Sequence, residues 1–317
     1  MRKHLFLLFL GFMHPCADRL NAEDIYADVS VYQELSDLYH PTAKDLHMVQ
    51  NYLTYGERSI INYLQDYKPN ARNLKIIGTT PEEQPEYGDI AVNCDASERE
   101  NCLIVYSSFN KNYPRGLKRL VNFVKNSDFR GHILYRIGGW PNLEGGALSL
   151  AHVPYAFKVS FFKEAQSKGF KRALWLDTSI LPVVSLNMIF NMIEEKGYFS
   201  MGNSHNIGPY ITSPAIQAFG ITYEEANRIP SCSAGITGID FTKNVGRTIV
   251  DRWYTAAKNK VAFFSPRSDQ NALSIILHSL GLDLCSIERL AHNRNNVNSQ
   301  TLFLIEREFV NEISLTQ

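Results

Sequence analysis

The sequence predicts an α/β fold whose central sheet is mostly parallel. Between residues 101 and 292, short apolar runs alternate with segments of helical periodicity, the pattern typical of a parallel sheet covered by helices. The most informative run, residues 173–176, lies between two cations and an acidic residue and has the composition of a strand buried on both faces. Asp177 follows at the carboxyl end of that strand, the edge where open parallel sheets bind ligands. Because Asp also closes turns, a structural role for Asp177 is an open alternative.

The N-terminus has the features of a signal peptide. The basic residues 2–4 precede the apolar run 5–13, so we expect removal of residues 1–17, with cleavage after Ala22 as the alternative. An apolar run this short cannot span a hydrocarbon core of ~30 Å, so we expect no retained transmembrane segment. The sequence therefore predicts an exported protein, whose final compartment stays open between the periplasm, the medium and a host cell.

Composition narrows the class of partner. The chain has 317 residues, of which 44% are hydrophobic, enough for a large core. Lys plus Arg and Asp plus Glu both number 32, so the charge balance indicates neither nucleic acid nor an anionic membrane as a partner. Any anionic ligand must therefore be met by locally placed cations.

The regions that flank the α/β segment have less informative patterns. Residues 23–100 are expected to form a helical N-terminal extension, because apolar residues recur there near helical spacing, and residues 293–317 are expected to be a C-terminal tail. Cys94 and Cys102 flank a polar stretch. This spacing suits a small loop disulfide in an exported protein, and free thiols are the alternative.

Turn residues divide the α/β segment into its elements. Gly169 and Gly197 are placed to end helices, and Pro182 restricts the run 180–184 to an edge or irregular strand. Gly235, in a strand of small residues, allows the close approach of a ligand or another backbone. Residues 202–214 predict a long loop. We expect strands at 102–106, 132–135, 173–176, 180–184, 198–201 and 232–241, and helices carrying 117–124, 154–168, 186–196, 244–258 and 269–278.

Several of these segments together resemble one family. Pro-Tyr-Ala-Phe-Lys at 154–158 precedes Leu-Asp-Thr-Ser at 176–179, Ser-Ala-Gly at 233–235 follows, and Asp-Gln-Asn-Ala-Leu-Ser begins at Asp269. The ordered set is similar to that of the nucleotide-diphospho-sugar transferases of GT-A fold, in the group of glycogenin and the lipopolysaccharide galactosyltransferases. The resemblance covers roughly residues 101–292.

The resemblance implies both a fold and a function. The fold would be a GT-A-like α/β/α sandwich with a mostly parallel central sheet. The protein would be a glycosyltransferase that transfers a hexose from a nucleotide-diphosphate sugar, most simply a UDP-linked one, to a glycan or protein acceptor. The alternative is a non-catalytic, exported GT-A-like protein that binds a glycan or a nucleotide.

The acidic motif departs from the family where a divalent metal would bind. Ser179 stands in place of the second metal-binding Asp, and a hydroxyl is a much poorer ligand for Mn²⁺ or Mg²⁺ than a carboxylate. The sequence provides Asp177 and His292 as metal-ligand candidates. Whether the protein uses a metal therefore stays open.

The resemblance and the predicted sheet edge together define the candidate site. Asp269 and Gln270 are the expected catalytic residues, although Asp269 at a helix start is also a natural N-cap. His205 and Trp140 are further ligand-contact candidates, with ordinary loop and core roles as the alternatives. Lys158 is expected to meet phosphate or to lie on a solvated helix face. The donor-binding candidates are Ser107, Ser108, Arg136, Lys158, Asp177, Ser179 and Gly235.

Overall fold

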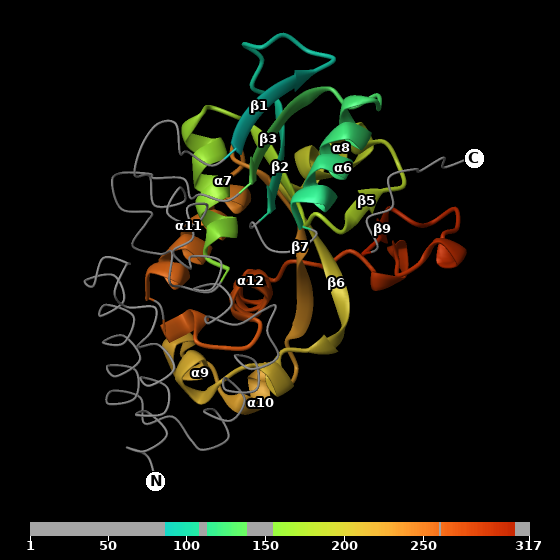
Figure 1. Cartoon of the computed structure of the whole chain (residues 1–317). Helices are drawn as coiled ribbons and strands as arrows, with labels where there is room; N and C mark the ends of the chain where they lie inside the picture. The colour runs from blue at the N-terminus through green and yellow to red at the C-terminus, as the bar shows by residue number, and fades with distance from the viewer. Residues whose placement is uncertain (1–85, 108–112, 138–154, 260, 308–317) are drawn as a thin grey trace, which may run out of the picture.

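The fold is built on a six-stranded central sheet. The computed structural model describes residues 86–107, 113–137, 155–259 and 261–307 (Figure 1). In this part of the chain the central strands have the spatial order β1-β3-β2-β4-β7-β6, and β5, β9 and β8 form a small second sheet. The central strands are β1 (Glu86–Val92), β2 (Asn101–Ser107), β3 (Gly131–Ile137), β4 (Arg172–Leu176), β6 (Tyr198–Asn206) and β7 (Pro230–Asp240). The small sheet contains β5 (Ile180–Pro182), β8 (Leu290–Ala291) and β9 (Phe303–Ile305).

The central sheet is mixed, which corrects the expectation of a mostly parallel one. Strand β2 pairs in parallel with β3 and β4, whereas the pairs β1–β3, β4–β7 and β6–β7 are antiparallel. Parallel neighbours need a crossover, and the helices between β2, β3 and β4 provide it. The helices between β6 and β7 lie beyond the end of the sheet instead, so the chain re-enters at the same end and β7 runs back beside β6 (Figure 1).

Helices cover both faces of the sheet. One face packs against α6 (Tyr113–Lys125) and α8 (Leu186–Lys196), and the other packs against α7 (Phe157–Ser167), α11 (Asn244–Asn259) and α12 (Ser268–Ser279) (Figure 1). The short helices α9 (Ser213–Phe219) and α10 (Tyr223–Ala226) lie at one end of the sheet. Short 3-10 turns occupy Gly208–Tyr210, Val261–Phe263, Ile287–Arg289 and Arg294–Asn296. The structure is therefore a layered α/β fold, as the alternation of strands and helices predicted.

Local sequence signals set several helix ends, and one of them, Gly197, was expected. The Ser185 hydroxyl accepts a hydrogen bond from the Asn187 backbone at the start of α8, and Gly197 ends that helix with φ of 86°. Thr222 and Glu225 form a reciprocal capping box around α10. These contacts satisfy backbone groups that a helix leaves unpaired at its ends.

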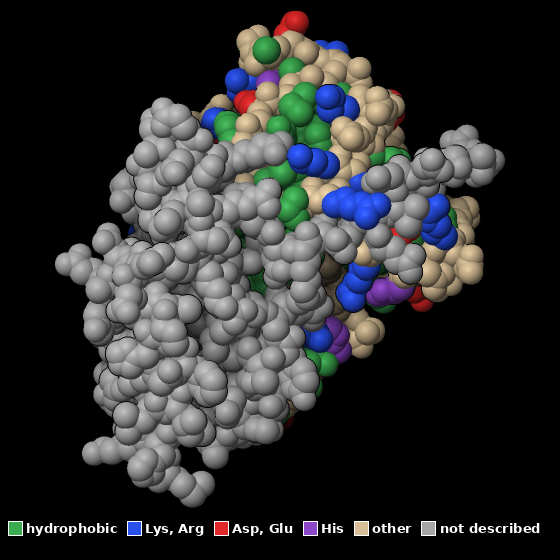
Figure 2. All heavy atoms as spheres, in the orientation of Figure 1, with side chains coloured by type: hydrophobic (Ala, Val, Ile, Leu, Met, Phe, Trp, Pro, Cys, Tyr) green, Lys and Arg blue, Asp and Glu red, His purple; other side chains and the backbone are tan. Residues whose placement is uncertain are grey.

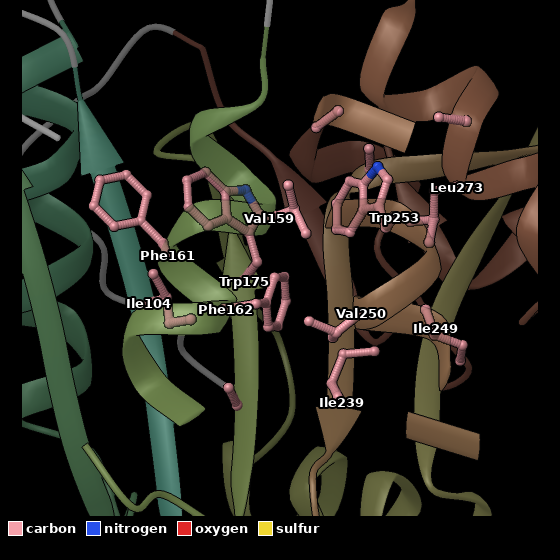
Figure 3. Packing of buried hydrophobic residues seen from close by; sticks show 14 of the residues in the cluster. Ile104, Val159, Phe161, Phe162, Trp175, Ile239, Ile249, Val250, Trp253 and Leu273 are labelled. Carbon is pink, nitrogen blue, oxygen red and sulfur yellow. The ribbon is translucent and has the colours of Figure 1, made fainter. Parts of the chain in front are cut away.

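The strand β4 is buried on both faces, which explains its continuous apolar run. Ala173 and Trp175 point into the layer with α7, α11 and α12, while Leu174 and Leu176 point into the layer with α6 and α8. Figure 3 shows Trp175 beside the aromatic rings of α7, with the Trp253 side chain of α11 nearby. The aromatic residues therefore fill the space between the sheet and this helix layer.

The structure redraws three predicted boundaries. Strand β1 belongs to the central sheet, so residues 86–92 are part of the α/β domain and not of a helical extension. Residues 23–85 of the predicted extension lie outside the described residues. Strand β9 extends the folded region into the predicted tail. The predicted loop 202–214 begins as strand, because β6 continues to Asn206 and its backbone pairs with β7 through two register shifts. Polar composition indicated a loop there, although an edge strand tolerates polar side chains.

The expectation that Pro182 restricts this run to an edge or irregular strand is confirmed. Strand β5 is three residues long and lies at the edge of the small sheet, where the missing N–H of proline is tolerated.

The four described cysteines are free thiols, so Cys94 and Cys102 follow the alternative without a disulfide. Within the described ranges no helix is both long enough and apolar enough to cross a bilayer. The predicted signal peptide lies outside those ranges.

The aromatic layer generates a stability prediction. Phe162 is fully buried and its ring centroid lies 6.1 Å from that of Trp253. Phe162→Ala should lower the free energy of unfolding by about 3–5 kcal/mol, because it removes apolar contacts and leaves a cavity. Chemical denaturation followed by circular dichroism measures this change. Met188→Ala, at an exposed position of α8, should change it by less than about 0.5 kcal/mol. Equal effects of the two substitutions would contradict this packing.

Candidate functional site

Asp177 lies immediately after the central strand β4. From β2 the chain continues to β3 on one side, while β4 pairs with β2 on the other, so β2 and β4 flank a point where the strand order reverses. Ligands of open α/β sheets bind at such a point, beyond the carboxyl ends of the strands. The Asp177 backbone N–H donates to Gly235 O at 2.9 Å, and its carbonyl accepts from Ile180 N at 2.8 Å. Asp177 therefore closes the turn and also lies at the ligand-binding edge.

A buried lysine joins two carboxylates at this edge. Lys158 Nζ lies 3.3 Å from Asp177 Oδ1 and 3.0 Å from Asp269 Oδ2, and it donates a hydrogen bond to Ala234 O at 3.2 Å. The side chains of Lys158 and Asp269 are 6% and 7% exposed, whereas that of Asp177 is 42% exposed. We call Lys158, Asp177 and Asp269 the Lys158 cluster. It draws together α7, β4, β7 and α12, and only its Asp177 reaches solvent substantially.

The positions of Lys158 and Asp269 decide two alternatives left open by the sequence. Helix α7 is buried around most of its circumference, so Lys158 lies in the core and not on a solvated face. Arg267 occupies the N-cap position of α12, and no side chain caps that helix. Asp269 is therefore not an N-cap, and its carboxylate is directed to Lys158. A buried charge needs such partners, since unpaired burial is very costly.

Aromatic rings complete the surroundings of the ammonium group. The ring centroids of Tyr155 and Trp175 each lie 5.7 Å from Lys158 Nζ, within the range of a cation–π contact. Tyr155 precedes α7 with φ of 61°, a backbone conformation that a bulky residue rarely adopts. Trp175 Nε1 also donates to Asp177 Oδ1 at 2.7 Å. The carboxylate of Asp177 is thus oriented by two groups, an indole and an ammonium.

The charges of the Lys158 cluster follow from burial and mutual attraction. Burial alone would lower the pKa of Lys158, but Asp177 and Asp269 outweigh it, and the pKa is raised above its ordinary value of 10.5. Burial raises the pKa of Asp269 above 3.8, because the attraction of Lys158 offsets desolvation only in part and Asp177 adds repulsion. One ammonium and two carboxylates carry a net charge of −1 when all are ionised. The cluster thus favours hydroxyl donors or cations over phosphate.

Gly235 is required beside Asp177. A Cβ at this position would lie 2.6 Å from Asp177 Oδ2, closer than real Cβ atoms come to a neighbour, and 3.1 Å from its Cγ. The group that comes close to Gly235 is the Asp177 carboxylate, in place of the expected ligand or backbone, and donor binding at Gly235 stays a prediction.

Gln270 faces β7 rather than the Lys158 cluster. Its side-chain Nε2 donates to the Ser231 hydroxyl at 2.8 Å, and its backbone carbonyl accepts from the Ser274 hydroxyl at 2.6 Å. The same Ser274 hydroxyl accepts from Cys232 N at 2.9 Å. Together these hydrogen bonds fix the first turns of α12 against β7 and thereby hold Asp269 in position.

The structure separates the other donor-binding candidates from this cluster. Ser107 is buried at the end of β2. Side chains alternate between the two faces of a strand, so Ser107 lies on the opposite face of the sheet from Lys158. Arg136 forms an ion pair with Glu164 and lies 4.2 Å from the Tyr87 ring centroid, so its charge is already compensated. Ser108 lies outside the described residues, as does Trp140.

The residues expected to bind a metal do not form a ligand set. Ser179 accepts a backbone hydrogen bond from Glu306 N at 2.7 Å, and His292 is exposed after β8 in the small sheet. Asp177 Oδ1 is engaged by Lys158 and Trp175. Among the described residues no group of three or more His, Cys, Asp or Glu side chains is arranged to hold a metal ion. The described residues therefore show no assembled metal site, and metal binding by Asp177 and His292 stays a prediction.

Two features of the site were missed from sequence. Trp175 lies two residues before Asp177 on the same strand, and residues so spaced share a face, so its contact with Asp177 was predictable. Arg267, which precedes α12 and packs on Tyr210, had no sequence signal.

No family model matches the chain, and no curated protein matches its sequence. The chemistry of the site must therefore be argued from its geometry.

Removal of the shared cation should expose the repulsion between the two carboxylates. Lys158→Met should lower the free energy of unfolding at pH 7 by about 3–5 kcal/mol, since breaking a buried ion pair leaves uncompensated charge. The pKa of Asp269 is higher in the folded state than in the unfolded state. As the pH falls toward 3.8, the folded state therefore binds more protons than the unfolded state, and acid should restore stability to the variant. The measurement is urea denaturation of both proteins from pH 7 to pH 4.

The control for this experiment lies on the same helix. Lys163 pairs with Asp251, whose side chain is 59% exposed, so Lys163→Met should cost less than about 1 kcal/mol at any pH tested. A Lys158→Met penalty that is equally small, or that does not shrink toward pH 4, would contradict the described ion pairs.

Gly235 and Asp177 should be energetically coupled. Gly235→Ala should lower the free energy of unfolding by about 1–3 kcal/mol through overpacking. The cost should fall by about 1 kcal/mol or more when Asp177→Ala removes the carboxylate that the new methyl meets. Chemical denaturation of the two single variants and the double variant measures the coupling, and additive effects would show that the two residues do not touch.

Proposed function

We propose that the protein is a glycosyltransferase of GT-A-like fold that transfers a hexose from a nucleotide-diphosphate sugar, most simply UDP-linked, to a glycan or protein acceptor. The observation that carries the proposal is the Lys158 cluster, which presents one half-exposed carboxylate at the carboxyl edge of β4. The layered mixed sheet and the order of the acidic, small-residue and Asp-Gln segments support it.

Asp177 takes the ligand-contacting role in this proposal. An ionised carboxylate only accepts hydrogen bonds, and the hydroxyls of a ribose or hexose donate them. Its orientation by Trp175 and Lys158 leaves little freedom to lose on binding. Asp269 is buried, so it acts by holding Lys158, which in turn orients Asp177.

The proposed transfer makes one bond, breaks another and releases a proton. The acceptor oxygen forms a bond to the anomeric carbon, the bond from that carbon to the phosphate oxygen breaks, and the acceptor hydroxyl loses its proton. An oriented carboxylate such as Asp177 can bind sugar hydroxyls or accept that proton. The departing diphosphate also needs positive charge, and Lys158 cannot supply it because two carboxylates already compensate it.

The catalytic proposal is tested by loss of one carboxylate. Full-length protein incubated with a panel of UDP-hexoses should release UDP slowly, and Asp177→Asn should reduce the rate by about a hundredfold, because the amide keeps the shape but loses the charge. Detection of released UDP measures the rate. Asp283→Asn is the control, since Asp283 is exposed and only its backbone oxygen has a described bond, to the Tyr198 hydroxyl.

The outcomes separate the proposal from its alternative. Turnover that Asp283→Asn preserves and Asp177→Asn abolishes supports the transferase. Binding of a UDP-hexose without release of UDP, lost in Asp177→Asn, would favour the non-catalytic exported binding protein. Equal turnover by both variants would remove Asp177 from the site.

A further inference from the structure

A second charged group lies at the start of α12, outside the Lys158 cluster. The Arg267 guanidinium carbon lies 3.7 Å from the ring centroid of Tyr210, and Nη1 donates to Nε2 of His205. The rings of His205 and Tyr210 are 4.9 Å apart at a T-shaped angle. We call Arg267, His205 and Tyr210 the Arg267 cluster. It joins α12 to the far half of β6 and to the turn that follows that strand.

The positive charge of Arg267 has no carboxylate partner in the described ranges. A guanidinium has five N–H donors, and within the described ranges one of them donates, to His205. Arg136 and Arg172 differ in this respect, since they form ion pairs with Glu164 and Glu194. Arg267 is partly exposed, so an anion from solution can reach its side chain.

The Arg267 cluster is held in place by the surrounding backbone. The Tyr210 carbonyl accepts from Asn271 Nδ2 at 2.7 Å, which fixes the ring beneath the guanidinium to the same helix. Thr212, two residues on, donates its hydroxyl to Phe264 O and its backbone N–H to the Ser265 hydroxyl. Arginine that is stacked and fixed in this way loses little freedom when it binds a planar or tetrahedral anion.

His205 is held neutral beside Arg267. Burial and the positive charge of Arg267 lower its pKa below 6.5. As a neutral ring it accepts the Arg267 hydrogen bond through Nε2, and its other nitrogen then carries the proton. The pair therefore holds one net positive charge, in contrast to the net negative Lys158 cluster.

We propose that Arg267 binds the diphosphate of the ligand and supplies the positive charge that a metal or Lys158 would otherwise provide. This inference rests on the proposed function. Arg267 and Asp269 are two residues apart, so their Cα atoms are at most about 7.6 Å from each other. A ligand with a hydroxyl-rich sugar and a diphosphate matches an acidic and a basic cluster that both include a residue at this helix start. Figure 2 shows Lys, Arg and His side chains gathered over the region of β6 and β9.

The proposal is tested by calorimetric titration in EDTA with inorganic pyrophosphate, UDP and uridine. The full chain should bind pyrophosphate and UDP, and Arg267→Ala should weaken both by about tenfold or more, because a charge-assisted contact is lost. Arg252→Ala is the matched control. It removes the same charge from α11, and Arg252 contacts Ser279 at the opposite end of α12, about 18 Å from Arg267 along the helix.

The outcomes distinguish this inference from the proposed function. Weaker diphosphate binding in Arg267→Ala but not in Arg252→Ala upholds the inference even if no UDP-hexose is turned over. UDP-hexose turnover that is unchanged in Arg267→Ala overturns the inference and leaves the transferase standing. Failure of the wild-type chain to bind either pyrophosphate or UDP also overturns it.

A measurement on the wild-type chain avoids any effect of Arg267→Ala on folding. Saturating pyrophosphate should raise the pKa of His205, since an anion beside Arg267 cancels the charge that lowers it. NMR titration of the imidazole, assigned with His205→Gln, measures the pKa. An unchanged pKa in saturating pyrophosphate would place the anion elsewhere.

Discussion

The burial of one ammonium group organises this protein. Lys158 is removed from water, and such a charge is tolerated when opposite charges and hydrogen-bond acceptors surround it. Those partners come from three further elements: Asp177 follows β4, Asp269 belongs to α12, and the Ala234 carbonyl belongs to β7. The relative positions of helix, sheet and helix are therefore fixed at the point where the ligand edge lies. Stability and the geometry of the site depend on the same contacts.

Two clusters of opposite charge each include a residue at the start of α12, Asp269 in one and Arg267 in the other. In the first, Asp177 presents a carboxylate whose neighbours leave the cluster net negative, and in the second, Arg267 stacks on Tyr210 beside a neutral His205. Such a division suits a ligand that is itself divided into hydroxyl-rich and anionic parts. A fixed guanidinium can provide positive charge without a metal, so the proposed diphosphate site does not depend on a second acidic residue at position 179, which is Ser179.

The sequence predicted those features that depend on local patterns. Strand β4 was predictable because both of its faces are apolar, and α8 because Ser185 and Gly197 mark its ends. The direction of β7 was not, because strand direction depends on where α9 and α10 lie in space. Lys158 was identified, but its burial depends on carboxylates 19 and 111 residues further along the chain. The ion pair of Arg136 with Glu164 could not be predicted for the same reason, since Glu164 belongs to another element.

The central claim is that the sheet edge at Asp177 is a nucleotide-sugar site. It is tested most directly by calorimetric titration of the full chain with a panel of UDP-hexoses, in EDTA and again with Mn²⁺. Because Arg267 is proposed to meet the diphosphate without a metal, at least one UDP-hexose should bind in EDTA, and excess UDP should displace it. The absence of binding to every nucleotide sugar in both conditions would contradict the claim.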